Sequence, residues 1–304
     1  MKVGLIGHGY WGKIVEKYLV DDKDIELKYV FDVNELDHPL YINDYEKVLS
    51  DKSVDTVFIC TPISTHFKLC EQALTNGKNV FCEKPTVRKK KELETLYTLA
   101  QNNKRILYTD YIYTVSPTIN FIKNNIANIG NLISISGRIE QFDTSYPHDN
   151  VYDVLGVHLL SAIYYITRVK ATNIEFRDLY KTNNVQAGTI YYTLKDGIKV
   201  ELFCSLIGCG KERKIQFIGS SGIIEFSLNT SPNYKMKQWR INNGRIYVLS
   251  EASFEFNEND GLARAIDEFK YLVSESVLES NFDTAFEVTG FLQEYIESSR
   301  DDDK

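Results

Sequence analysis

The chain has 304 residues, of which 43% are hydrophobic and 25% charged, and its formal net charge at pH 7 is −7. This composition is typical of a globular protein, and the length favours two domains. The acidic balance without a basic stripe argues against nucleic acid as a partner, and no apolar run is long enough to predict a membrane span.

The first predicted elements contain a dinucleotide-binding motif. Residues 3–6 are an apolar run typical of a buried strand, and Gly7-His8-Gly9-Tyr10-Trp11-Gly12 follow directly. Apolar residues at helical spacing then predict a helix, and Asp32 stands at the end of the next apolar run, residues 27–31. A G-x-G-x-x-G segment between strand and helix, with an acidic residue after the second strand, indicates a Rossmann-type dinucleotide site. A glycine-rich turn that serves packing alone is the alternative.

Each part of this motif has a physical role. Gly7 allows the tight turn, Gly9 lets the backbone approach a pyrophosphate, and Gly12 lets the helix pack closely on the strand. The unpaired N–H groups at the helix start attract phosphate, so we expect all six residues of the motif to contact the cofactor. The Asp32 carboxylate can accept hydrogen bonds from ribose hydroxyls and would repel a 2′-phosphate. We therefore expect NAD(H) rather than NADP(H).

Strands and helices go on alternating up to about residue 108. This alternation predicts an α/β fold with a parallel, doubly wound sheet, whose ligand crevice lies at the carboxyl ends of the strands. Thr61-Pro62 and Glu83-Lys84-Pro85 fall at such ends, and we predict an NAD-binding Rossmann domain over residues 1–118. The predicted elements are strands at 54–60, 79–82 and 105–108, helices at 44–49 and 90–102, and a helix that Gly77 ends.

The pattern changes after Pro117, where long strands begin to follow one another. Asp196-Gly197 and Ser220-Ser221-Gly222 are predicted hairpin turns. Long strands joined by hairpin turns predict an α+β domain over residues 119–304 with a large, mostly antiparallel, open-faced sheet. The last helix is expected to pack back on the first domain. The helices are too few to cover both faces of the sheet, so we expect a homodimer or homotetramer through it. The predicted strands lie at 132–141, 173–180, 185–194, 198–206, 213–218 and 223–228, and the helices at 118–128, 156–167, 261–276 and 282–299.

Cysteine and histidine usage predicts no metal site and indicates a reduced compartment. The five cysteines are scattered without a CxxC pair, and the five histidines show no paired spacing. We therefore expect a cytoplasmic protein without a bound metal.

Four segments give the chain a resemblance to a known family. Besides the glycine motif, they are Thr61-Pro62 followed by His66, Glu83-Lys84-Pro85, and Gly156-x-His158 at a helix start. Over nearly its whole length the chain resembles the glucose–fructose oxidoreductase, inositol dehydrogenase and rhizopine-catabolism (Gfo/Idh/MocA) oxidoreductases. The resemblance implies hydride transfer to or from a nicotinamide cofactor. It also implies a cis peptide bond before Pro85, and that Lys84 contacts cofactor and substrate and takes part in proton transfer.

The chemistry of alcohol oxidation explains which residue types are needed. The leaving proton requires a base within hydrogen-bonding reach, and a nearby positive charge stabilises the developing alkoxide. Lys84 supplies such a charge, and Glu83 beside it can pair with a ribose hydroxyl or hold the lysine. His158 matches the family's catalytic histidine, and imidazole titrates near neutral pH. The alternatives are a solvated lysine at the start of a basic stretch and a histidine satisfied within the core.

One position departs from the family pattern. The family usually has an aspartate four residues before the histidine, where this chain has Val154, and Asp153 stands one residue earlier. A local bulge of one residue would restore the carboxylate–imidazole geometry; alternatively, Asp153 points away and caps the helix that follows. Asp153 is therefore a candidate catalytic residue. The departure keeps open a second function, a catalytically impaired NAD-binding protein that senses a sugar ligand.

The candidate substrate residues are Tyr111 and Arg138, each otherwise an ordinary residue of its segment, and His148 in a loop. His66 is expected to contact the adenosine half of the cofactor or to cap a helix. Residues 150–153 are similar to the matching segment of nucleotide-sugar dehydrogenases in the family. The resemblance therefore implies a sugar, a polyol or a sugar derivative as substrate, with an imine or a bile-pigment-like acid as the alternative.

Overall fold

The computed structural model describes residues 1–142, 146, 149–278 and 280–301. The chain divides into two compact units. The first comprises Met1–Ile112 and Leu262–Gln293, and the second comprises Tyr113–Gly261 and Glu294–Lys304. The sequence analysis expected a domain boundary after residue 118, and this boundary stays a prediction. The compact units divide after Ile112, and the first unit also includes residues 262–293.

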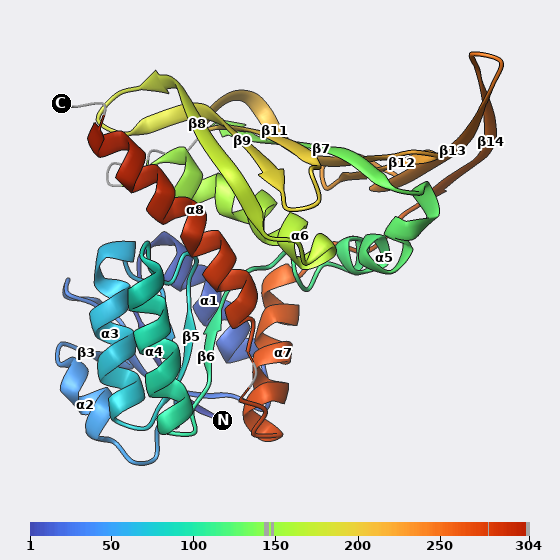
Figure 1. Cartoon of the computed structure of the whole chain (residues 1–304). Helices are drawn as coiled ribbons and strands as arrows, with labels where there is room; N and C mark the ends of the chain where they lie inside the picture. Colours follow the sequence, from blue (N-terminus) through green and yellow to red (C-terminus); the bar gives the residue numbers. More distant parts are fainter. Residues whose placement is uncertain (143–145, 147–148, 279, 302–304) are drawn as a thin grey trace. The chain divides into compact units, whose positions relative to one another are not determined.

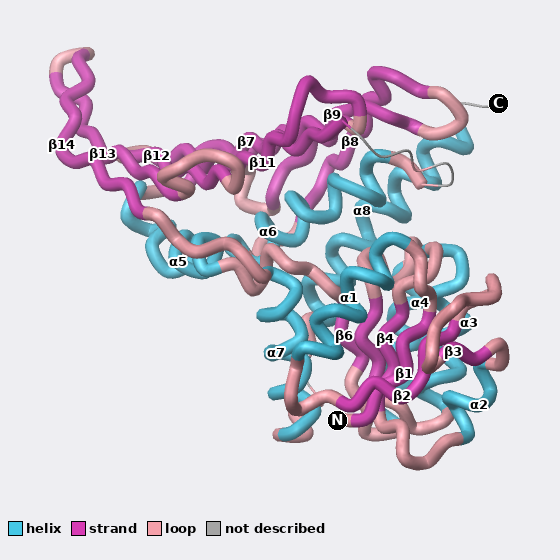
Figure 2. Tube along the Cα trace, turned by 180° about the vertical axis from the view of Figure 1, so that it is seen from behind, coloured by secondary structure: helices cyan, strands magenta, loops and turns pink. Residues whose placement is uncertain are grey.

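The first unit is built on a six-stranded parallel sheet with the strand order β3-β2-β1-β4-β5-β6. β4 and β5 are buried along their whole length because helices cover both faces of the sheet. α3 and α4 lie on one face (Figure 1), and α1 lies on the other (Figure 2). The doubly wound parallel sheet that the sequence predicted is confirmed. The strands are β1 (Lys2–Ile6), β2 (Glu26–Phe31), β3 (Tyr41–Ile42), β4 (Thr56–Ile59), β5 (Asn79–Cys82) and β6 (Leu107–Thr109), and the helices are α1 (Tyr10–Asp21), α2 (Tyr45–Ser50), α3 (Ile63–Thr75), α4 (Lys90–Asn102) and α7 (Gly261–Ser274). A further helix, α8 (Phe282–Asp301), belongs to this unit up to Gln293 and to the second unit from Glu294.

An aromatic cluster fills the core of this unit. Phe58 in β4, Phe81 in β5 and Tyr108 in β6 are in register across the sheet, and neighbouring rings stack at centroid distances of 4.6 and 5.4 Å. Phe269 of α7 meets the first two rings edge-on. These side chains are fully buried, so their packing fixes the strand ends from which the candidate site is built.

The second unit contains an eight-stranded sheet with the strand order β14-β13-β12-β11-β7-β10-β9-β8. β7 and β10 pair in parallel and the other neighbours are antiparallel, which confirms the predicted mostly antiparallel sheet. α5 and α6 lie along one face (Figures 1 and 2). The strands are β7 (Leu132–Phe142), β8 (Ala171–Lys181), β9 (Val185–Leu194), β10 (Lys199–Ser205), β11 (Ile207–Gly219), β12 (Gly222–Ser227), β13 (Tyr234–Asn242) and β14 (Arg245–Phe254), and the helices are α5 (Pro117–Asn125), a 3-10 turn (Ile126–Ile129), a π turn (Tyr152–Gly156) and α6 (Val157–Thr167).

The sequence analysis missed the hairpin of β13 and β14. Its turn has Asn243 at φ +50° and Gly244 at φ +73°, the two positive angles of a type I′ turn. Asn-Gly is the strongest short hairpin signal, so the turn was legible in the sequence. Every residue of β14 but one is exposed. This strand therefore lacks the alternation of apolar and polar residues by which a half-buried strand is predicted.

Candidate active site

The glycine motif forms the turn from β1 into α1, as its spacing predicts. Gly7 has φ +92°, and its N–H donates to the carbonyl of Phe31 at 2.8 Å. A Cβ on Gly12 would collide with the carbonyl of Gly7, whereas a Cβ on Gly9 would meet no atom within 4 Å. The backbone at Gly12 is therefore tightly packed, where helix and strand meet, whereas the space in front of the Gly9 backbone contains no other atoms of the chain. This open backbone at the N-terminus of a helix suits a pyrophosphate.

Asp32 follows β2 directly, and its carboxylate points to the same turn. Its Oδ2 accepts a hydrogen bond from the N–H of His8 at 2.7 Å, and its Oδ1 accepts from the N–H of Asn34 at 2.9 Å. Burial acts to raise the pKa of Asp32, but these hydrogen bonds lower it below its usual value. Asp32 is thus an anion held beside the nucleotide loop, which fits the recognition of an unphosphorylated ribose.

A histidine–glutamate–histidine cluster adjoins this loop. Glu16 of α1 contacts His8 Nε2 and His38 Nε2, each at 2.7 Å, and these are the groups that the described residues offer to a metal ion. However, the N–H of Leu40 donates to Nδ1 of His38 at 3.1 Å, so the ring hydrogen of His38 is on Nε2 and points at Glu16. A metal-ligating histidine donates from its second nitrogen instead. The cluster is therefore held by hydrogen bonds.

The second cluster of site residues lies at the ends of β5 and β6. Glu83 follows β5, and its Oε1 accepts a hydrogen bond from the indole N–H of Trp11. Its Oε2 accepts from the N–H of Lys84 at 3.3 Å, and the Lys84–Pro85 peptide is cis, as the resemblance implied. Asp110 follows β6 and is hydrogen-bonded to Glu83. The sequence analysis missed Asp110 because nothing in its local pattern marks it.

His66 fastens two of the loops to each other. Its Nε2 contacts the carbonyl of Thr61 at 2.8 Å, and its Nδ1 contacts the carbonyl of Pro85 at 3.0 Å. Carbonyls only accept, so both ring nitrogens donate and the ring is charged. Burial opposes this charge, but Cys82 and the two carbonyls raise the pKa of His66 to about 9. The predicted cofactor contact of His66 stays a prediction, since its polar atoms hold the loops of Thr61-Pro62 and Pro85.

In the second unit, Asp153 lies within a π turn, and His158 follows that turn in the first turn of α6. Residues Tyr152–Gly156 form this turn, and the N–H of Val157 donates to the carbonyl of Tyr152, five residues back. The turn inserts one residue into the helix, which is the local bulge that the sequence analysis considered. Asp153 is 2% exposed, and its Oδ2 accepts from the N–H of Asn150 at 3.3 Å. In a helix with one inserted residue, the position five residues before His158, which is Asp153, takes the place that the fourth residue before it has in a regular helix.

Tyr113 is the aromatic neighbour of His158, with ring centroids 5.2 Å apart. It is buried, and within the described residues its hydroxyl has no hydrogen-bond partner. Burial raises the pKa of Tyr113, so the hydroxyl stays protonated at neutral pH. Its position beside His158 depends on the fold of the second unit, so no local pattern in the sequence marks it. Tyr111 itself is fully buried in the first unit.

The remaining substrate candidates are placed differently. Arg138 binds Glu140 and Glu212 at 2.8 and 3.0 Å and stacks over Phe203. It alternates along β7 with Gly137, whose position faces Leu159 of α6, so Arg138 points to the opposite face of the sheet. The structure thus does not bring Arg138 to His158. His148 lies outside the described residues.

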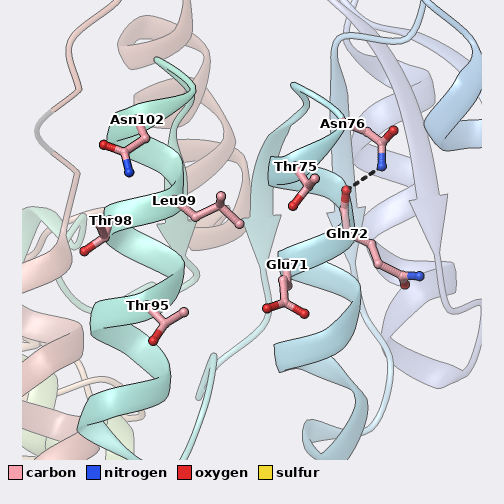
Figure 3. Close-up of a pocket in the computed structure, with 8 residues that line it drawn as sticks. All are labelled: Glu71, Gln72, Thr75, Asn76, Thr95, Thr98, Leu99 and Asn102. Atoms are coloured by element: carbon pink, nitrogen blue, oxygen red, sulfur yellow. Dashed lines mark hydrogen bonds between the residues drawn. The ribbon is translucent and has the colours of Figure 1, made fainter.

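A groove between α3 and α4, with a volume of about 400 Å³, is separate from these clusters. Figure 3 shows the side chains of both helices that line it, all of which are polar except Leu99. None of the predicted site residues is among those that line it, so it plays no part in the site described above. The lining residues are Glu71, Gln72, Thr75, Asn76, Thr95, Thr98, Leu99 and Asn102.

Comparison with known proteins relates the first part of the chain to a family. Residues 1–111 match the model of the GFO_IDH_MocA family, described as an oxidoreductase family with an NAD-binding Rossmann fold. Over these residues the chain is similar to the Gfo/Idh/MocA oxidoreductases. The resemblance predicted from the motifs is confirmed, as is a nicotinamide-dinucleotide-binding Rossmann fold. The described part of the chain contains no helix that is long and apolar enough to span a membrane.

Similar proteins match this chain over different lengths. UDP-N-acetylglucosamine 3-dehydrogenase of Acidithiobacillus ferrooxidans is 24% identical over 88% of this chain and 87% of its own. The oxidoreductase YhhX of Escherichia coli is 26% identical over 41% of this chain, and the match spans only 39% of YhhX. The solved structure of the A. ferrooxidans enzyme superposes with a TM-score of 0.82 and 21% identity over 96% of both chains. The solved structure of scyllo-inositol dehydrogenase from Lactobacillus casei contains NAD(H) and scyllo-inositol. It superposes with a TM-score of 0.77 and 18% identity, over 96% of this chain and 95% of its own.

Proposed function

We propose that this chain is an NAD-dependent oxidoreductase of the Gfo/Idh/MocA family that interconverts a secondary alcohol and a ketone on a sugar, a polyol or a sugar derivative. The bound nicotinamide cofactor supplies or accepts the hydride. The glycine motif, Asp32, Thr61-Pro62 and Glu83-Lys84 are the residues that would hold it. The open backbone at Gly9 and the anionic Asp32 support this fit.

The preference for NAD over NADP is supported by Asp32. Its hydrogen bonds keep it ionised, and a fixed negative charge beside the ribose opposes a 2′-phosphate. D32S should bring the dissociation constants of NAD⁺ and NADP⁺ closer together, which titration calorimetry measures. An unchanged ratio of the two constants would exclude Asp32 as the determinant.

The observation that carries the catalytic proposal is the π turn before α6. It supports a role for Asp153 as the carboxylate that orients His158, although Val154 occupies the usual position. We propose that His158 exchanges the hydroxyl proton and that Lys84 stabilises the developing alkoxide. A π turn is rare and is often found at functional sites, so its presence here favours an enzyme over an impaired sensor.

The substrate class is proposed from the relatives. One acts on UDP-N-acetylglucosamine and another was solved with scyllo-inositol, so ring hydroxyls are the shared chemistry. Reduced nicotinamide absorbance should be followed with NAD⁺ and a panel of sugars, inositols and sugar nucleotides. Oxidation of one of them supports the enzyme. NAD⁺ binding without any redox change across the panel supports the sensor.

Substitution at the proposed catalytic positions tests the roles. With the substrate that the wild-type chain oxidises, K84A and H158N should each lower kcat/KM by more than about a hundredfold. H158N should bind NAD⁺ with unchanged affinity, because this residue has no part in the nucleotide loop. Turnover by K84A within a few-fold of wild type would show that the assignment is wrong. E201Q, on β10, serves as a control for the loss of a surface charge.

We also propose assembly as a homodimer or homotetramer through the eight-stranded sheet. On the sheet face that carries Arg138, Arg138 stacks over Phe203 and Arg177 stacks over Tyr191, and arginine and aromatic residues are enriched in protein interfaces. Light scattering of wild type and of F203D should distinguish an oligomer from a monomer. The cytoplasmic location stays a prediction from cysteine usage.

A further inference from the structure

The pairing of β5 and β6 brings two buried acids together. Cys82 and Thr109 are opposite each other in these parallel strands, so the residues that follow them, Glu83 and Asp110, leave the sheet side by side. The N–H of Asp110 donates to the carbonyl of Cys82 at 2.9 Å and continues the ladder. Glu83 is 8% exposed and Asp110 is 2% exposed, and the two side chains are hydrogen-bonded.

This hydrogen bond requires a proton, since ionised carboxylates contain only acceptor atoms. The oxygens of Glu83 already accept from two N–H donors, the indole of Trp11 and the backbone of Lys84. Asp110 has no such donors: within the described residues, its buried Oδ1 has no hydrogen-bond partner. A buried carboxylate oxygen without a donor is costly, whereas a neutral acid is not. The shared proton therefore belongs to Asp110.

We propose that Asp110 is a neutral carboxylic acid whose hydrogen bond to Glu83 positions the Glu83–Lys84 segment for catalysis. Asp110 is a positioning residue, since it acts through Glu83 and not on the reacting atoms. The inference rests on the proposed function for the role of Lys84, but the protonation of Asp110 does not depend on it.

The charged surroundings are consistent with one anion at this pair. Lys84 faces both acids, and the charged ring of His66 on α3 faces Glu83. The thiol of Cys60 also faces the pair, and burial raises its pKa well above the usual value, so it is neutral. Burial first, and Glu83 second, raise the pKa of Asp110 well above that of an ordinary aspartate. Ionisation of Asp110 would place two adjacent carboxylates out of water.

An infrared comparison of wild type and D110N at pH 8 tests the protonation directly. A protonated carboxyl has a C=O stretching band that carboxylates lack, and we expect D110N to lose one such band. D51N is the matched control: Asp51 accepts hydrogen bonds from Lys28, Tyr29 and Ser53, which keep it ionised, so this substitution should leave the band intact. Absence of the band in wild type would overturn the proposal.

Kinetics test the positioning role. The amide of D110N can still donate to Glu83, so its kcat should stay within about threefold of wild type, whereas D110A should lose about tenfold or more in kcat with little change in NAD⁺ affinity. Equal losses in D110N and D110A would overturn the role. If D110A does not fold, the D110N kinetics and the infrared band decide. If wild type oxidises no substrate yet shows the band, the proposed function fails while the protonation of Asp110 stands.

Discussion

The Nε2 hydrogen of His38 is donated to Oε1 of Glu16 at 2.7 Å, and this bond holds the segment after β2 against α1. Asp32 begins that segment. We expect H38A to raise the dissociation constant of NAD⁺ by about three- to tenfold, or ~1 kcal/mol, with little change in kcat. Titration calorimetry measures the affinity, and E35A, an exposed position in the same segment, is the control. Equal affinity in H38A and wild type would show that this bond does not position Asp32. A chelator should have no effect, because the cluster is held by hydrogen bonds.

The pKa of His66 predicts a loss of stability at alkaline pH. The ring has a pKa of about 9 in the folded chain against 6.5 for an unperturbed histidine. Its contribution is complete below pH 6.5, where the ring is protonated in both the folded and the unfolded state, and it is lost as the pH rises toward 9. The difference in unfolding free energy between wild type and H66Q should therefore shrink by up to about 3 kcal/mol from pH 6 to pH 9.5. Urea unfolding at both values measures it, and a constant difference would contradict the charged ring.

Two glycines of the nucleotide loop should respond differently to alanine. G12A places a Cβ against the carbonyl of Gly7, so it should lower the unfolding free energy by about 1–3 kcal/mol. G9A meets no atom within 4 Å and should keep its stability within about 1 kcal/mol, yet block the approach of the pyrophosphate. Thermal unfolding and NAD⁺ titration separate the two effects. Wild-type affinity in G9A would show that the cofactor does not approach the backbone here.

Much of the fold was predictable because its signals are local. The strands of the first unit are continuous apolar runs, and the glycine motif and Asp32 mark the turns at their ends. The missed hairpin shows the limit of this approach. β14 is exposed, so its side chains carry no core pattern, and only Asn243-Gly244 marked the turn.

The candidate site was predictable in part. Lys84 and His158 belong to motifs that the sequence shows, but their neighbours depend on long-range pairing. Asp110 meets Glu83 only because β5 and β6 are adjacent, and Tyr113 meets His158 only through the fold of the second unit. The π turn leaves the apolar pattern of the helix unchanged, and only the one-residue offset of Asp153 from the family's usual position indicated it.

The π turn leads to a prediction about two adjacent positions. In a regular helix, the residue four places before His158 shares its side, whereas the inserted residue gives that place to Asp153, five places before. D153N should therefore lower kcat by about ten- to a hundredfold, because it removes the carboxylate that we propose orients the imidazole. Adding V154D to D153N should not restore the rate, although it recreates the aspartate position usual in the family. The rate of each variant is measured with the substrate found for wild type, and V154D alone reports the cost of a buried acid at that position. Restoration of kcat in the double variant would mean that position 154 also reaches the side of the helix on which His158 lies, which contradicts the effect inferred from the π turn.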